Sequence, residues 1–234
     1  MLAKESATLD LLSEGRFELG IGAGWMVSDY EQSGIPYDSP GERIARMVEG
    51  IHVIKGMFAP GPFTFEGKYY TITGLEGFPK PFRPGGPPIL VGGGGKRVLT
   101  LAGALADIVG INANHRAGVI GPDAGQDAVP TNIDNKLQWV KAGAGNRFGD
   151  LEIQIRVHLV HVTDDRNGFA ELFAGGFGIS TEDALGTPLA LIGTHQQIIE
   201  TILERRERWG MSYFTLDATY MDEFAPIVTA LAGK

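Results

Sequence analysis

The feature that most constrains the fold is a regular alternation of short apolar segments with amphipathic ones along the chain. The short apolar segments predict β-strands, and apolar residues at helical spacing predict helices. Helical connections of this length join parallel strands, because each helix returns the chain to the same edge of the sheet. The sequence therefore predicts an α/β fold with a parallel sheet. The predicted strands are 16–22, 89–91, 107–111, 151–162 and 213–217, and the predicted helices are 2–13, 41–58, 96–105, 132–142, 195–208 and 221–232.

The nucleotide-binding motifs of other α/β folds do not fit this sequence. In the dinucleotide fingerprint G-x-G-x-x-G, Trp25 stands where the third glycine is needed after Gly20 and Gly22. A phosphate loop of the Walker type also fails, since Gly95-Lys96 is followed by arginine rather than Ser or Thr. A (β/α)8 barrel of the TIM type remains, although only about five of its eight core strands are recognisable.

Three predicted strands end in glycine-bearing turns, and the carboxyl ends of barrel strands share one rim where ligands bind. The turn at Gly92–Gly95 opens a helix whose free N–H groups suit a phosphate, with a plain β-to-α turn as the alternative. Thr194 and Gln197 have capping-box spacing, so that turn also has a simpler interpretation as a helix start. The candidate ligand-binding residues at these strand ends are Gly22, Ala23, Gly24, Trp25, Gly92, Gly93, Gly94, Gly95, Gly193 and Thr194.

Few polar residues have a position that indicates chemistry. His115 and Arg116 lie in a long segment, 112–131, that we interpret as a lid or binding loop and as a source of substrate contacts. Arg156 and His158 share the polar face of one predicted strand. No grouping of His, Asp and Glu has metal-ligand spacing, and no G-x-S-x-G elbow is present. The catalytic residues stay unassigned.

Composition narrows the class of protein. The chain has 20 Lys and Arg against 28 Asp and Glu, a net charge of −8, which argues against binding to nucleic acid or to anionic membranes. It has no cysteine, so disulfides, thiol nucleophiles and Cys-ligated zinc are excluded. The opening residues lack the apolar core of a signal peptide, and no apolar run is long enough to span a bilayer. We expect a soluble, cytoplasmic protein with a small-molecule substrate.

Stretches from most of the chain resemble the luciferase-like monooxygenase superfamily, in particular its deazaflavin (coenzyme F-420)-dependent oxidoreductases of actinobacterial type. The similarity is carried by the stretches LAKE and LDLLS in the first helix, GRFELGIGAGW at 15–25, DYE and GIPYD at 29–38, PGER at 40–43, PILVGGGG at 88–95, ADIVGIN at 106–112 and LIGT at 191–194.

The resemblance implies one (β/α)8 barrel domain over 1–234, whose strand ends hold a flavin or deazaflavin. It places Gly22–Gly24 along the ring, Gly92–Gly95 at the phosphate tail and Asn112 facing the pocket. The implied activity is hydride transfer between coenzyme F-420 and a small organic substrate. The alternatives are an FMN-dependent monooxygenase that uses oxygen, and a shortened paralogue that binds without catalysis.

Compared with the family, the chain is expected to lack about 60 to 70 N-terminal residues that carry strands one to three of the barrel. This expected truncation leaves the strand at 16–22 with an open edge, which proteins usually cover by pairing or with a partner chain. We therefore expect a homo-oligomer.

Overall fold

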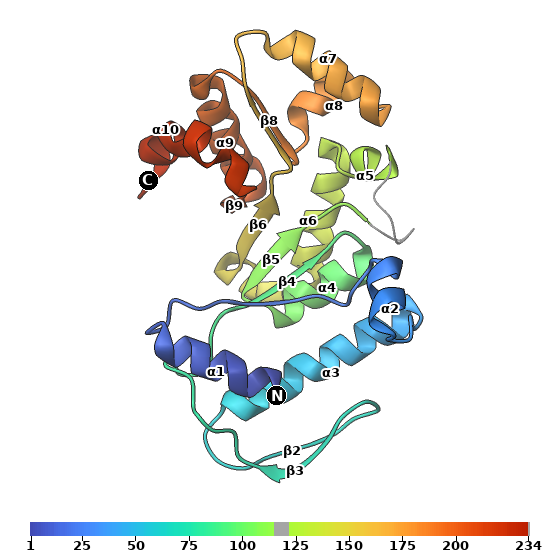
Figure 1. The fold of residues 1–234 in the computed structure, drawn as a ribbon, viewed down its shortest axis with the longest axis vertical. Coiled ribbons are helices and arrows are strands. Elements are labelled where there is room, and N and C mark those ends of the chain that lie inside the picture. Colours follow the sequence, from blue (N-terminus) through green and yellow to red (C-terminus); the bar gives the residue numbers. More distant parts are fainter. Residues whose placement is uncertain (115–121, 234) are drawn as a thin grey trace.

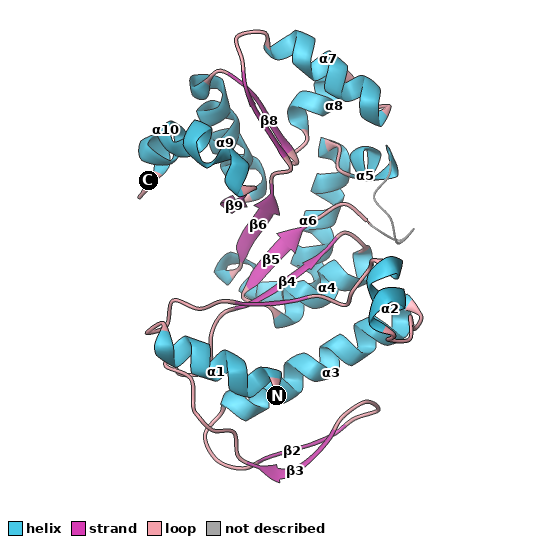
Figure 2. Cartoon of the chain, viewed as in Figure 1, coloured by secondary structure: helices cyan, strands magenta, loops and turns pink. Residues whose placement is uncertain are grey.

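The computed structural model describes residues 1–114 and 122–233, and Figure 1 gives the course of the chain. Helices and strands alternate along most of it, as Figure 2 shows by colour. The strands are β1 (Leu19–Ile21), β2 (Phe63–Glu66), β3 (Thr71–Leu75), β4 (Ile89–Gly93), β5 (Ile108–Ile111), β6 (Glu152–Arg156), β7 (Leu159–Val162), β8 (Ala190–Gly193) and β9 (Met211–Thr215). The helices are α1 (Leu2–Leu12), α2 (Val27–Ser33), α3 (Pro40–Phe58), α4 (Lys96–Leu105), α5 (Pro122–Asp127), α6 (Pro130–Ala144), α7 (Arg166–Phe177), α8 (Thr181–Gly186), α9 (His195–Trp209) and α10 (Met221–Leu231), with short 3-10 helices η1 (Gly145–Asp150) and η2 (Ala218–Tyr220).

The centre of the fold is a five-stranded sheet in the order β1-β4-β5-β6-β9, in which every neighbouring pair is parallel. The predicted parallel α/β architecture is thereby confirmed. Strand β1 pairs only with β4 in the described part of the chain, so it is the edge strand expected from the segment 16–22. Strands β7 and β8 form a separate parallel pair, and β2 and β3 form an antiparallel hairpin that stands away from the main sheet (Figure 2).

The two faces of the main sheet differ in character. One face is apolar and packs against α3, α4 and α6 through a single buried core. Residues on the opposite face alternate with these, and they are mostly glycine or polar. The apolar row contains Ile21, Val91, Val109, Ile153 and Met211, and the helices add Met47, Ile51, Leu99, Ile133 and Val140.

The sheet is strongly curved, as a side-chain hydrogen bond between its two edges shows. Strands in a sheet are about 4.8 Å apart, so a flat sheet of this order would separate β1 from β9 by roughly 19 Å. Instead, the hydroxyl of Tyr213 on β9 donates a hydrogen bond of 3.1 Å to Oε2 of Glu18, which directly precedes β1. The polar face is therefore the concave one.

This contact can be tested through the titration of Tyr213. Burial and the adjacent carboxylate of Glu18 both raise the pKa of this phenol above its ordinary value. We expect Glu18→Gln to lower the pKa of Tyr213 part of the way back, since the charge is removed while the burial stays. The titration is followed by ultraviolet absorbance, with Glu31→Gln on α2 as the control carboxylate. An unchanged Tyr213 pKa in Glu18→Gln would show that the two edges do not meet.

The strand predicted over 151–162 is two strands with different partners. Strand β6 pairs with β9 and β7 pairs with β8, and the change occurs at two adjacent residues. The N–H of Val157 donates to the Thr215 carbonyl, whereas the N–H of His158 donates to the Leu189 carbonyl. The apolar alternation continues through this point, so the pattern did not reveal the break.

Four helices lie outside the ranges predicted to be helical, namely α2, α5, α7 and α8. The segment 112–131 contains α5 and the start of α6, and 163–191 contains α7 and α8. Helix α2 covers 27–33, between the predicted strand 16–22 and the predicted helix 41–58. These helices are short or rich in glycine, and such segments show little of the amphipathic pattern on which the prediction depends.

Candidate functional site

The carboxyl ends of β1, β4 and β5 lie at one edge of the sheet, and they bring most of the predicted cofactor residues together. Helix α4 begins directly after the turn that follows β4, with Gly95 as its N-cap. No side chain caps this helix, so its first N–H groups face outward without an internal acceptor. Arg97 in the first turn extends to the start of α3, where its Nη1 lies 3.2 Å from the position that a Cβ on Gly41 would take.

The segment 112–114 packs directly on this turn. The N–H of Asn112 donates to the Gly93 carbonyl at 2.9 Å. A Cβ on Gly94 would lie 2.3 Å from the Ala113 carbonyl oxygen, and one on Gly95 would lie 3.7 Å from Nδ2 of Asn114. Residues 112–114 and the glycine turn thus form a closely packed backbone corner at the start of α4. The expected place of Asn112 in a cofactor pocket stays a prediction.

A floor without side chains adjoins this corner on the concave face of the sheet. Gly92 on β4 is paired with Gly110 on β5, and the same register continued past Ile21 brings Gly22 beside Gly92. A Cβ on Gly22 would meet no atom within 4 Å, and one on Gly92 would reach only the Asn112 amide and the Gly110 carbonyl. Gly22 and Gly92 on two neighbouring strands thus present bare backbone, which suits close approach by a flat ligand. Gly110 on β5 is covered, because a Cβ there would lie 2.8 Å from Oε1 of Gln154.

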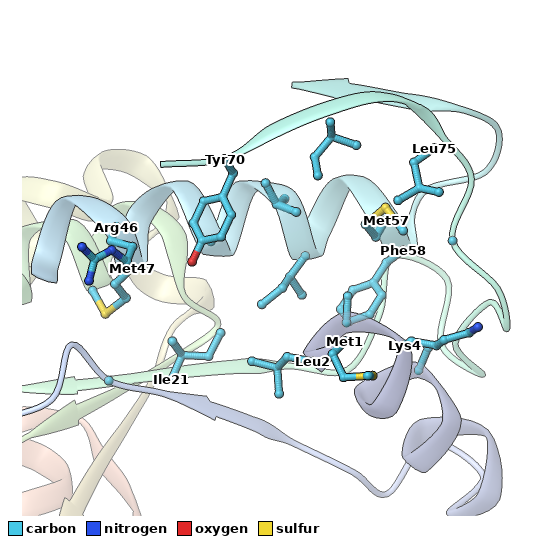
Figure 3. Close-up of a pocket in the computed structure, with 18 of the residues that line it drawn as sticks. Met1, Leu2, Lys4, Ile21, Arg46, Met47, Met57, Phe58, Tyr70 and Leu75 are labelled. Carbon is cyan, nitrogen blue, oxygen red and sulfur yellow. The ribbon is translucent and has the colours of Figure 1, made fainter. Parts of the chain in front are cut away.

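A cavity of about 900 Å³ opens beside the end of β1, between α1, α3 and the β2–β3 hairpin. Its wall is mostly apolar. Figure 3 shows Phe58 from α3 near Met1 and Leu2, and Met57 from α3 beside Leu75 from β3. Gly22, Ala23 and Gly24 contribute to its lining, so this predicted turn belongs to both the floor and the cavity. The volume is that of a pocket for a drug-sized or cofactor-sized molecule.

One cation in this wall escaped the sequence analysis. Arg43 on α3 is only 8% exposed, and its guanidinium lies 4.0 Å from the ring centre of Tyr37. It donates to the Tyr37 hydroxyl and the Asp38 carbonyl, while its Nε has no partner among the described residues. The sequence does contain one indication that Arg43 is buried. Arg43 stands four residues before Met47, at the helical spacing of the buried stripe of α3.

Two other predicted residues have structural roles at their positions. Thr194 and Gln197 form the expected capping box, with Thr194 N–H donating to Gln197 Oε1 at 2.9 Å. Gly193 has a φ of +133°, and a Cβ on it would lie 2.6 Å from Oε1 of Gln197. Gly193 ends β8 and Thr194 follows it, so both lie beside the β7–β8 pair, beyond β6 and on the far side of β5 from β1 (Figure 1). Their part in a cofactor site stays a prediction.

Trp25 is half-buried and is not among the residues that line the cavity. Its carbonyl accepts a hydrogen bond of 3.0 Å from the Tyr37 hydroxyl, which ties the end of the glycine turn to the residues before α3. Its place among the candidate binding residues stays a prediction.

The polar residues considered as substrate contacts lie in two separate segments of the chain. His115 and Arg116 lie outside the described residues. Arg156 and His158 are exposed near the carboxyl end of β6. The pKa of Asp217 is lowered mainly by its hydrogen bonds with Thr219, and the positive charge of Arg156 lowers it further. By register Arg156 stands beside Thr215. Within residues 1–114 and 122–233, no three His, Asp or Glu side chains are grouped as a metal site would require.

Comparison with known proteins identifies the class of this fold and site. The family model described as luciferase-like monooxygenase matches residues 1–120, about half of the sequence. The chain belongs to this family.

Among its relatives is an FMNH(2)-dependent dimethylsulfone monooxygenase of Pseudomonas fluorescens, 28% identical over 264 aligned positions that cover all of this chain and 71% of the relative. An F-420-dependent glucose-6-phosphate dehydrogenase of Kineococcus radiotolerans is 35% identical over 107 positions, covering 46% of this chain and 31% of the relative. The solved structure of an F-420-dependent secondary alcohol dehydrogenase superposes on this chain with a TM-score of 0.69 at 19% identity. The superposition covers 98% of this chain and 74% of the dehydrogenase chain, which shows a shared fold. Helices long and apolar enough to cross a membrane are absent from the described residues.

Proposed function

We propose that the protein is an oxidoreductase that binds a deazaflavin, coenzyme F-420, at the carboxyl edge of β1, β4 and β5. The coenzyme would exchange a hydride with a small organic substrate. The proposal is supported by family membership, because relatives named for FMNH2 and for F-420 both belong to this group. The proposal also includes a barrel architecture. It is supported by the curvature of the sheet and by the Tyr213–Glu18 hydrogen bond that joins its two edges.

The residues present fit such a group. A ring system that is flat and tricyclic needs a surface without side chains, and the glycine floor formed by Gly22 and Gly92 offers one. A phosphate needs N–H donors and a positive field, and the uncapped start of α4 offers both. The observation that carries the proposal is that the floor and the helix start are adjacent, joined by the turn that follows Gly92.

The chain's own groups would bind, orient and shield the cofactor, which supplies the hydride chemistry when bound. The N–H groups at the start of α4 would hold the phosphate tail, and Asn112 would border the ring through its side-chain amide. The apolar wall formed by Met47, Met57 and Phe58 would exclude water from the substrate side. Arg43 would place a fixed positive charge in that wall.

Titration of the purified protein with each cofactor tests the proposal. We expect quenching of F-420 fluorescence with micromolar affinity, and weaker binding of FMN. Tight binding of FMN together with oxygen consumption would instead establish the monooxygenase alternative, since a deazaflavin does not activate oxygen as a flavin does. Failure to bind either cofactor at micromolar concentration would contradict both and favour the non-catalytic paralogue.

A further inference from the structure

A lysine is buried beneath the candidate cofactor corner. Lys136 on α6 is 1% exposed, although it carries an ammonium group. Burial lowers the pKa of this lysine, and the nearby Asp127 only partly offsets that effect. An ammonium group in such a position costs folding free energy unless its hydrogen bonds are made. The hydrogen bonds of the Lys136 ammonium group therefore indicate its structural role.

Those bonds converge on the segment that walls the start of α4. The Nζ of Lys136 donates to the Asn112 carbonyl at 2.7 Å and also to Oδ2 of Asp127. The same carboxylate oxygen accepts a hydrogen bond of 2.7 Å from the Asn114 N–H. The lysine and its carboxylate thus fix both ends of the three residues 112–114.

The fixed segment is the one that contacts the glycine turn. Ala113 and Asn114 lie against Gly94 and Gly95, and Asn112 bonds to the backbone of Gly93. A shift of this segment would therefore change the shape of the corner where a phosphate would be held. Lys136 itself is enclosed, and it acts on the corner through the Asn112 carbonyl and through the carboxylate of Asp127.

We propose that Lys136, with Asp127, is a positioning residue for cofactor binding, which holds the segment 112–114 in the geometry that accepts the phosphate-bearing tail. This inference rests on the proposed function. Support from behind the contacting residues is what keeps a binding site within a fraction of an ångström of its working shape.

Lys136→Met tests the inference, with Lys55→Met as a matched control. Lys55 on α3 also donates to a backbone carbonyl, that of Leu105 at 2.6 Å, but Leu105 lies at the opposite, amino end of β5. We expect Lys136→Met to raise the dissociation constant of the cofactor about 10-fold, and Lys55→Met to leave it within about twofold. Binding is measured by fluorescence titration with F-420 or FMN, whichever the unaltered protein binds, alongside thermal unfolding of each variant.

Two further variants keep the test decisive. Lys136→Arg retains a cation and is expected to recover most of the affinity. If Lys136→Met does not fold, the double variant with Asp127→Asn removes the carboxylate left without its partner and is expected to bind about 10-fold more weakly than the unaltered protein. Equal affinity in the Lys136 and Lys55 variants would overturn the inference. Absence of cofactor binding by the unaltered protein would instead count against the proposed function.

Discussion

Gly22→Val is expected to weaken cofactor binding by about 100-fold or more while leaving the fold intact. A Cβ at this position meets no atom within 4 Å, so a valine side chain fits the protein without displacing anything. The space it would enter is the space above the glycine floor and beside the cavity, to which Gly22 contributes. A ring lying on the backbone there would collide with the two added methyl groups. The dissociation constant and the midpoint of thermal unfolding are measured on the same preparation.

The matched control is Gly20→Val, two residues earlier on the same face of β1. Its Cβ position also meets nothing within 4 Å, and it is not part of the cavity lining. Both changes add the same side chain at a position with open space around its Cβ, so we expect small and similar effects on stability. We expect Gly20→Val to bind cofactor normally. Equal affinities for the two variants would place the ring elsewhere in the molecule.

Gly93 and Gly94 are poor positions for such a test. A Cβ on Gly93 would lie 2.5 Å from Val98, and one on Gly94 would lie 2.3 Å from a backbone oxygen of Ala113. Any side chain at either position must move neighbouring atoms, so folding and binding would be lost together. Gly95 is different, because its Cβ would make only ordinary contact with Asn114.

Local patterns predicted the elements that build the site. The strands at 89–91 and 107–111 and the helices that follow 95 and 194 have apolar periodicity together with glycine or capping residues at their ends, so both kinds of signal agree. Parallel pairing then follows from the helical connections, and it is what brings Gly92 to Asn112.

Contacts that depend on three-dimensional packing could not be predicted in this way. The break between β6 and β7 depends on which strand each half pairs with, and Val157 and His158 look like any other alternating residues. The support given by Lys136 depends on the meeting of α6 with the end of β5. In the sequence, Lys136 stands beside Leu137 in the buried stripe of α6, which is an unusual position for a lysine. That position does not indicate which groups the lysine contacts.

The same substitution in two helices is expected to have opposite effects on stability. Helices α4 and α6 pack so closely that a Cβ on Gly143 would lie 1.8 Å from the Thr100 carbonyl oxygen, and one on Gly103 would lie 2.2 Å from that of Val140. Because both obstacles are backbone atoms, Gly143→Ala must separate the helices that cover β4 and β5, and we expect it to lower the free energy of unfolding by about 2–3 kcal/mol.

Gly175 lies in α7 with nothing within 4 Å of its Cβ position, and it is exposed. Gly175→Ala should therefore raise the free energy of unfolding by about 0.5–1 kcal/mol, since alanine restricts the unfolded chain and favours a helix. Urea denaturation followed by circular dichroism measures both variants. A Gly143→Ala protein as stable as Gly175→Ala would mean that α4 and α6 do not meet backbone to backbone, and the apolar face of the sheet would then need a different cover.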